Sequence, residues 1–225
     1  MISFELKRPY VKDLTKYRTV IFDCDGVVLD SNRIKTDAFA KVLKAYDHDL
    51  VEKFLHYHKT HGGVSRFIKF DYFFKEFLRY TDYSNLTKTA VDNYSEIVKE
   101  ALKNCSYIPG ILPLLKEVNY LKLNCYLVSG GAENELCEVF KYRNIERFFK
   151  GIYGSPTSKS DIVDGLKRVE KSFDPVIYFG DARFDMEIAE MYQMDFVFVS
   201  GKSEWEEGKF ICQERGHTVV PDYNL

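Results

Sequence analysis

Residues 19–26 read Thr19-Val20-Ile21-Phe22-Asp23-Cys24-Asp25-Gly26, so two carboxylates directly follow a short apolar run. A short apolar run that ends in turn-forming residues is typical of a strand buried on both faces of a sheet. We therefore expect residues 19–22 to form the first core strand. Asp23 and Asp25 would then lie at its carboxyl end.

Comparable apolar runs recur later in the chain, at residues 124–128, 176–179 and 195–199, each followed by glycine, serine or aspartate. Helix-length amphipathic patterns separate them, at residues 133–142, 160–170 and 185–192. Strands that alternate with helices form a parallel sheet with helices packed against it. The sequence thus predicts an α/β fold with a doubly wound, Rossmann-like parallel sheet.

The segment after the first strand breaks this alternation. It holds helix-length amphipathic stretches at residues 32–46, 65–80 and 85–104, and no convincing strand pattern. We expect an inserted α-helical domain over residues 31–106. The α/β core would comprise residues 1–30 and 107–225.

Composition narrows the possible partners. The formal net charge of −2, from 32 basic and 34 acidic residues, gives no reason to expect a nucleic acid or an anionic membrane as partner. No stretch approaches the ~20 apolar residues that a membrane span requires. The five cysteines are scattered singly, which suits a reducing compartment. We expect a cytoplasmic monomer or homodimer that acts on a small molecule.

Chemically reactive side chains follow the predicted strands, where ligands bind in open parallel sheets. They are Asp23, Asp25, Ser129, Lys159, Asp181 and Asp185. Phosphoryl transfer needs a nucleophile, a cation across the phosphate oxygens and donors that neutralise charge. Clustered carboxylates suit Mg²⁺, while lysine and serine supply the donors. Asp23 is therefore a candidate nucleophile and Asp25 a candidate general acid and base.

The run from Asp23 to Ser31 resembles the signature of the haloacid dehalogenase-like hydrolase superfamily, in its phosphoglycolate phosphatase and β-phosphoglucomutase branch. Ser129 before Gly130 is similar to the second motif, Lys159 to the third, and the segment from Gly180 to Asp185 to the acidic fourth motif. The resemblance implies that Asp23 is the nucleophile and Asp25 the acid and base. It further implies phosphate binding by Ser129, Gly130 and Lys159, a magnesium site among Asp23, Asp25, Asp181 and Asp185, and a mobile cap formed by the helical insertion.

Two features near these motifs have alternative explanations. The third motif of the family usually reads lysine then proline, whereas Pro156 here precedes Lys159, and Lys150 is the second candidate for that role. Asp30 and Ser31 stand just before a helical stretch, and we interpret them as helix-capping residues rather than catalytic ones.

In the helical insertion, Arg66 and Lys69 follow a glycine pair and are candidates for contact with the substrate. The alternative is that both belong to a solvated helix face. His56, His58 and His61 are close in sequence, but no cysteine or paired carboxylate accompanies them, so we do not expect a metal site there.

The sequence therefore predicts a magnesium-dependent phosphoric monoester hydrolase that acts on a small phosphorylated metabolite, such as a sugar phosphate or a phosphoglycolate-like compound. Asp25 argues against the dehalogenase branch, whose members lack the second aspartate. A phosphomutase is the main alternative, because the segment from Gly63 to Arg66 resembles the cap loop of β-phosphoglucomutase. A non-catalytic phospho-receiver or binding module is a further alternative.

Overall fold

The computed structural model describes residues 13–224, so the first 12 residues, which the sequence assigns to the core, lie outside the described part. Six parallel strands form one sheet in the order β3-β2-β1-β4-β5-β6. The strands are β1 (Thr19–Phe22), β2 (Asn124–Ala132), β3 (Gly151–Ser155), β4 (Val176–Gly180), β5 (Asp195–Val199) and β6 (Thr218–Val220). The predicted parallel α/β sheet is confirmed, and β2 runs four residues further than its apolar pattern.

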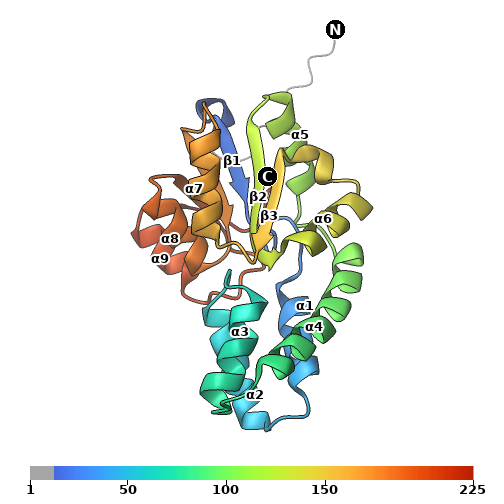
Figure 1. Ribbon diagram of the computed structural model, residues 1–225. Coiled ribbons are helices and arrows are strands. Elements are labelled where there is room, and N and C mark those ends of the chain that lie inside the picture. The colour runs from blue at the N-terminus through green and yellow to red at the C-terminus, as the bar shows by residue number, and fades with distance from the viewer. Residues whose placement is uncertain (1–12, 225) are drawn as a thin grey trace.

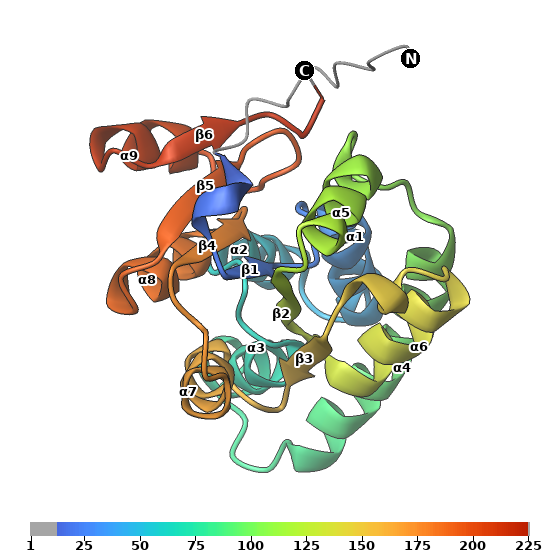
Figure 2. The ribbon, with the colours of Figure 1, turned by 90° about the horizontal axis from the view of Figure 1, so that it is seen from above.

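Helices cover both faces of this sheet (Figure 2). They are α5 (Ile111–Tyr120), α6 (Glu133–Tyr142), α7 (Lys159–Val169), α8 (Arg183–Met191) and α9 (Gly208–Glu214). Successive side chains of a strand point to opposite faces, so Val20 and Phe22 of β1 pack with α5 and α6, while Ile21 packs with α7 and α8. The sheet is thus doubly wound, and its strands are apolar throughout because both faces are buried.

A helical insertion separates β1 from β2 and lies beyond the carboxyl ends of the strands (Figure 1). It contains α1 (Asn32–Leu43), α2 (His48–Thr60), α3 (Arg66–Tyr72), a π-helical segment (Phe73–Phe77) and α4 (Ser84–Asn104). The single helix expected over residues 65–80 is therefore wrong in detail: α3 ends at Tyr72 and a wider π turn follows. The division of the chain into two domains stays a prediction.

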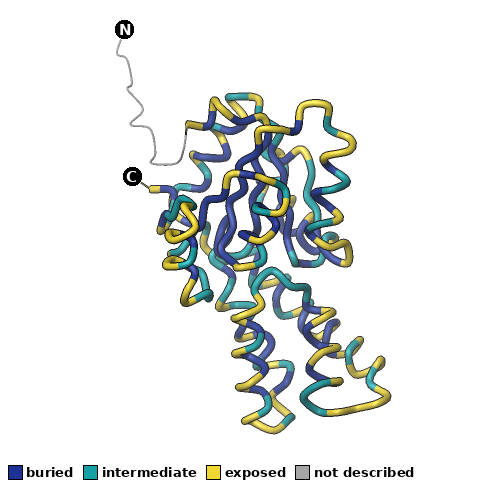
Figure 3. Tube along the Cα trace, turned by 90° about the vertical axis from the view of Figure 1, so that its left-hand side faces the viewer, coloured by how far each residue is buried: buried dark blue, intermediate teal, exposed yellow. Residues whose placement is uncertain are grey.

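Aromatic packing holds the insertion together, and its buried positions face inward (Figure 3). The Phe39 ring lies 5.4 Å from Phe54, 5.0 Å from Phe70 and 4.5 Å from Tyr94, measured between ring centroids. These contacts join α1, α2, α3 and α4. They fix the helices that present charged side chains to the end of the sheet.

Within residues 13–224, no helix combines the length and the apolar character needed to cross a membrane.

Candidate active site

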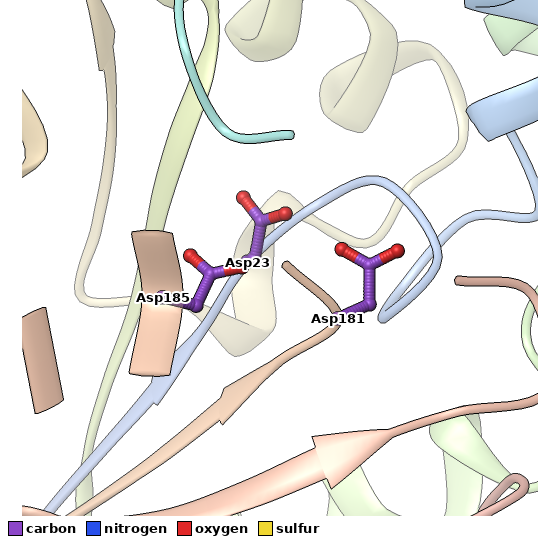
Figure 4. Close-up of side chains that lie close together, drawn as sticks. All are labelled: Asp23, Asp181 and Asp185. Atoms are coloured by element: carbon purple, nitrogen blue, oxygen red, sulfur yellow. The ribbon is translucent and has the colours of Figure 1, made fainter. Parts of the chain in front are cut away.

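Three buried carboxylates meet at the carboxyl ends of β1 and β4 (Figure 4). Asp23 follows β1, Asp181 follows β4, and Asp185 lies in the first turn of α8; each offers an oxygen within 4.8 Å of the others. The two strands are neighbours, with Phe22 paired to Phe179, so their ends coincide. Between them, Gly26 has φ +71°, and a Cβ there would lie 2.2 Å from Asp181 Oδ2, which accounts for the glycine after the two aspartates.

The electrostatics of this cluster favour a bound cation. Burial raises the pKa of Asp23 to about 7; Lys159 opposes this shift, and the charges of Asp185 and Asp25 add to it. Burial, followed by the charges of Asp23 and Asp185, raises the pKa of Asp181 well above its usual value. Hard carboxylate oxygens packed this closely match the ligands of a divalent cation such as Mg²⁺, whose charge would relieve the repulsion.

Lys159 joins the cluster from α7. Its Nζ donates to Asp23 Oδ1 at 2.8 Å and to Asp185 Oδ1 at 2.5 Å. Asp185 also accepts from the Tyr178 hydroxyl at 3.1 Å and from the Ala182 backbone N–H at 3.2 Å, so it holds Lys159 in place. Pro156 precedes Lys159 instead of following it as in the family motif. Lys159 still reaches Asp23, because it is the first residue of α7.

Lys150, the other candidate for the third motif, lies elsewhere. Its Nζ pairs with Glu170 at 2.7 Å and bonds Asn124 at 3.0 Å, and its side chain is half exposed. Of the two lysines, only Lys159 reaches Asp23.

Asp25 has a different environment from the other three aspartates. Ser31 Oγ donates to its Oδ1 at 2.6 Å, and Lys35 Nζ pairs with its Oδ2. Burial acts to raise the pKa of Asp25, but the Lys35 charge and both hydrogen bonds outweigh burial and lower it. Its side chain is not one of the three whose oxygens lie within 4.8 Å of one another, and its role as a metal ligand stays a prediction.

Ser31 lies at the helix end as its interpretation as a capping residue predicts, but its side chain has a different role. Ser31 occupies the N-cap position of α1, but its side chain makes no capping bond and binds Asp25 instead. Asp30 forms an ion pair with Lys202 at 2.8 Å.

Ser129 and Gly130 bring the end of β2 to the same region. Ser129 is buried, and its Oγ accepts from the Gly131 backbone N–H at 3.1 Å. A Cβ on Gly130 would lie 2.3 Å from the Gly63 carbonyl oxygen, and one on Gly62 would lie 2.9 Å from Ala182 Cβ. The loop before α3 thus packs on two strand ends, and glycines permit that close approach.

A cavity of about 70 Å³ lies between the insertion and the sheet. Asp23, Asp25 and Asp181 line it from the sheet, and Lys35, Arg66 and Lys69 line it from the insertion. Arg66 pairs with Glu135 of α6 at 2.9 Å, and both Arg66 and Lys69 are buried. The alternative of a solvated helix face is therefore wrong for both residues.

Sequence reasoning missed three polar residues of this site. Asn32 Nδ2 donates to Asp181 Oδ2 at 2.5 Å, Lys35 pairs with Asp25, and Glu204 lines the cavity from the loop after β5. A helix that starts after Ser31 places positions 32 and 35 on one face, so helical spacing was an available signal. Glu204 follows a strand, as ligand-binding residues do in such sheets.

The solved structures that resemble this chain include phosphatases and a mutase. One is described as a predicted phosphoglycolate phosphatase from Haemophilus somnus (TM-score 0.72, 14% identity, covering 94% of this chain and 96% of that one). Another is β-phosphoglucomutase from Clostridium difficile (TM-score 0.69, 19% identity, covering 92% of each chain). A third is a HAD-hydrolase of Bacillus subtilis, solved with bound magnesium and showing interdomain movement (TM-score 0.60, 17% identity, covering 82% and 89%). At these identities the likeness establishes the fold.

Family membership rests on the sequence itself. No curated protein sequence matches the chain. A sequence profile described as haloacid dehalogenase-like hydrolase matches residues 20–199, which include all but the first residue of β1, the whole of β2 through β5, and the carboxylates Asp23, Asp181 and Asp185. The chain belongs to the haloacid dehalogenase-like hydrolase family.

Proposed function

We propose that this protein is a magnesium-dependent phosphatase that hydrolyses a small phosphorylated metabolite, such as a sugar phosphate or a phosphoglycolate-like compound, through an aspartyl phosphate on Asp23. One observation carries the proposal: Lys159 bridges Asp23 and Asp185, while Asp25 is held two residues away by Ser31 and Lys35. This arrangement supplies an oriented nucleophile and a separate acid and base.

In the first step, an Asp23 carboxylate oxygen attacks phosphorus, and the bond from phosphorus to the ester oxygen breaks. In its protonated form, Asp25 gives its proton to the departing oxygen, so the alcohol leaves neutral. Because Lys35 and Ser31 lower the pKa of Asp25, this form is populated mainly at acidic pH. Asp25 then takes a proton from water, which attacks the aspartyl phosphate and releases phosphate from Asp23. Lys159, Ser129 and Gly130 would receive the phosphate oxygens. Mg²⁺, held by Asp23, Asp181 and Asp185, would neutralise charge on the transferring group.

We further propose that the helical insertion, residues 31–106, acts as a cap. Its loop packs on the strand ends, and the cavity beneath it is small beside typical ligand pockets of about 300–1000 Å³. The interdomain movement of the B. subtilis HAD-hydrolase supports a cap that opens to admit substrate.

Removal of the metal is expected to abolish phosphate release, and Mg²⁺ should restore it. Asp181→Ala should raise the magnesium concentration needed for half-maximal rate by at least about tenfold, because a carboxylate ligand is lost. Phosphate release measured against magnesium concentration tests this, with the exposed Asp37→Ala as the matched control. An unchanged magnesium requirement in Asp181→Ala would show that the metal site is elsewhere.

A phosphomutase is the second candidate, because Arg66, the first residue of α3, lines the cavity, and the segment from Gly63 to Arg66 resembles the cap loop of β-phosphoglucomutase. A mutase must hold a second phosphate in the cap while the intermediate turns round. It would release little phosphate, need a bisphosphate primer and nearly stop without Arg66.

For a phosphatase, Arg66→Ala is expected to raise KM more than it lowers kcat, and free phosphate should appear in step with substrate loss. The assay compares phosphate release with isomer formation on hexose 1-phosphates. The exposed Arg79→Ala is the control, and Arg66→Ala/Glu135→Ala avoids leaving a buried carboxylate unpaired. Isomer formation that outruns phosphate release would establish the mutase instead.

A further inference from the structure

A chain of hydrogen bonds runs from the cavity to the core across the cap. Lys69 Nζ lies 2.8 Å from His58 Nδ1, and His58 Nε2 lies 3.0 Å from Thr36 Oγ1. Thr36 Oγ1 lies 2.9 Å from both carboxylate oxygens of Glu204. The first three residues belong to α3, α2 and α1 of the cap, whereas Glu204 belongs to the loop after β5.

The Glu204 carboxylate decides which atom donates and which accepts in each of these hydrogen bonds. An ionised carboxylate only accepts, so the Thr36 hydroxyl donates to Glu204 and accepts from His58 Nε2–H. The Nδ1 atom of His58 is then unprotonated and accepts from Lys69. Burial, followed by the charges of Lys69, Lys35 and Lys59, lowers the pKa of His58 well below its usual value, which keeps the ring neutral.

Lys69 is a buried cation without a carboxylate partner. It is 2% exposed, and no carboxylate in residues 13–224 lies within ion-pair distance of its Nζ. Arg66, Lys35 and Lys159 differ, since each contacts a carboxylate. Two of the three ammonium protons of Lys69 are used, on His58 Nδ1 and on the His58 carbonyl at 3.2 Å.

The charges around Lys69 come from several elements. Burial lowers the pKa of Lys69 to about 7; Lys35 of α1 and Lys159 of α7 add to this shift, while Glu204 and Asp25 oppose it. An ammonium enclosed without a counter-charge is costly, because burial removes its hydration and supplies no pairing in return. The side chain lines the same cavity as Asp23, so a ligand bound there can supply the missing charge.

We propose that Lys69 determines substrate specificity by binding a second negatively charged group of the phosphate ester, and that His58, Thr36 and Glu204 position it so that cap closure depends on that group. The proposal rests on the phosphatase function above and narrows its substrate to esters that carry a carboxylate or a second phosphate. Closure over an ester whose phosphate is its only anionic group leaves the buried ammonium of Lys69 unpaired. Closure over an ester with a second anionic group pairs it.

The preference should weaken as the pH rises. Above pH 7 or so, the closed cap can hold Lys69 in its neutral form, so closure over an ester without a second anionic group becomes easier. Closure over an ester with a second anionic group keeps the proton on Lys69 and changes little. The ratio of the two affinities is therefore largest below pH 7 and falls above it.

Trp205, the single tryptophan of the sequence, lines the cavity next to Glu204, so its fluorescence should report ligand binding and cap closure. We would titrate the protein with Mg²⁺ and two non-hydrolysable ligands, phosphonoacetate and ethylphosphonate, which differ in the carboxylate. We expect phosphonoacetate to bind roughly ten- to hundredfold more tightly, the scale of a hydrogen bond to a charged group. Propane-1,3-bisphosphonate against propylphosphonate tests a second phosphate in the same way.

Lys69→Met should reduce the preference to a few-fold, whereas the exposed Lys75→Met, in the same cap, should keep it. Glu204→Gln should weaken the preference and change its pH profile, and a merely structural role would not move that profile. Equal binding of both members of both ligand pairs by the wild type would overturn the proposal. So would a preference that survives Lys69→Met; if that variant does not fold, Glu204→Gln and the wild-type pH profile decide.

Turnover separates this proposal from the proposed function. The matched substrates are 2-phosphoglycolate and ethyl phosphate, and Lys69→Met should raise the KM for 2-phosphoglycolate relative to the KM for ethyl phosphate. If no ester is hydrolysed but the phosphonate preference persists, the phosphatase function fails and the anion site stands. If both esters are hydrolysed with equal KM, in wild type and variant alike, the anion site fails and the phosphatase function stands.

Discussion

Asp23→Asn is expected to lower the rate of phosphate release by on the order of 10⁴-fold or more, the scale seen when an enzyme loses its nucleophile. The amide keeps the shape of the side chain but has no anionic oxygen to attack phosphorus. Its position is set by β1 and by Lys159, which donates to Oδ1 at 2.8 Å. Phosphate release from a panel of phosphorylated metabolites with Mg²⁺ measures the effect.

The same variant should fold at least as well as the wild type in metal-free buffer at pH 8. Burial, with the charges of Asp185 and Asp25, raises the pKa of Asp23 from its usual 3.8 to about 7. Ionising Asp23 therefore destabilises the folded protein, and this loss of stability grows as the pH rises from about 4 to about 7. Thermal melting checks the fold, and mass spectrometry excludes deamidation back to aspartate. Wild-type activity in the intact variant would reject the mechanism. A stable aspartyl phosphate on the wild-type protein, without turnover of any ester, would favour the phospho-receiver alternative.

Asp25→Asn is expected to reduce the rate at least about a hundredfold, the usual contribution of general acid and base catalysis. The loss should be greatest for alkyl phosphates, whose leaving oxygen needs a proton, and smaller for p-nitrophenyl phosphate, whose leaving group does not. Ser31 and Lys35 hold both oxygens of Asp25, so the effect should come from lost proton transfer rather than from a displaced loop.

Asp30→Asn is the matched control for this variant, because Asp30 lies on the same loop but pairs with Lys202. It should retain nearly the full rate with both substrates. A normal rate of alkyl phosphate hydrolysis by Asp25→Asn would show that another group moves the proton, and Lys35 would be the first to test.

The parallel sheet could be predicted because each strand carries its own local signal. Residues 19–22, 124–128, 176–179 and 195–199 are apolar on both faces and end in turn residues, and all four lie in strands. Both edge strands have a weak local pattern, because β3 contains two glycines and a serine and β6 has only three residues. The break between α3 and the π turn was missed because a wider helical turn has no distinct pattern among aromatic residues.

The sequence by itself determined the order of strands and helices, and it placed Asp23, Asp25, Ser129, Lys159, Asp181 and Asp185 after strands or at the start of helices. These features depend on neighbours within a few residues, whose spacing the chain displays directly. Only the tertiary structure decided which charges meet. Arg66 pairs with Glu135 across 69 positions, Lys159 with Asp23 across 136, and Asn32 with Asp181 across 149. Burial and pairing of a charge depend on contacts between distant segments, so the unpaired Lys69 and the polar chain to Glu204 became visible only when the insertion was seen packed on the sheet.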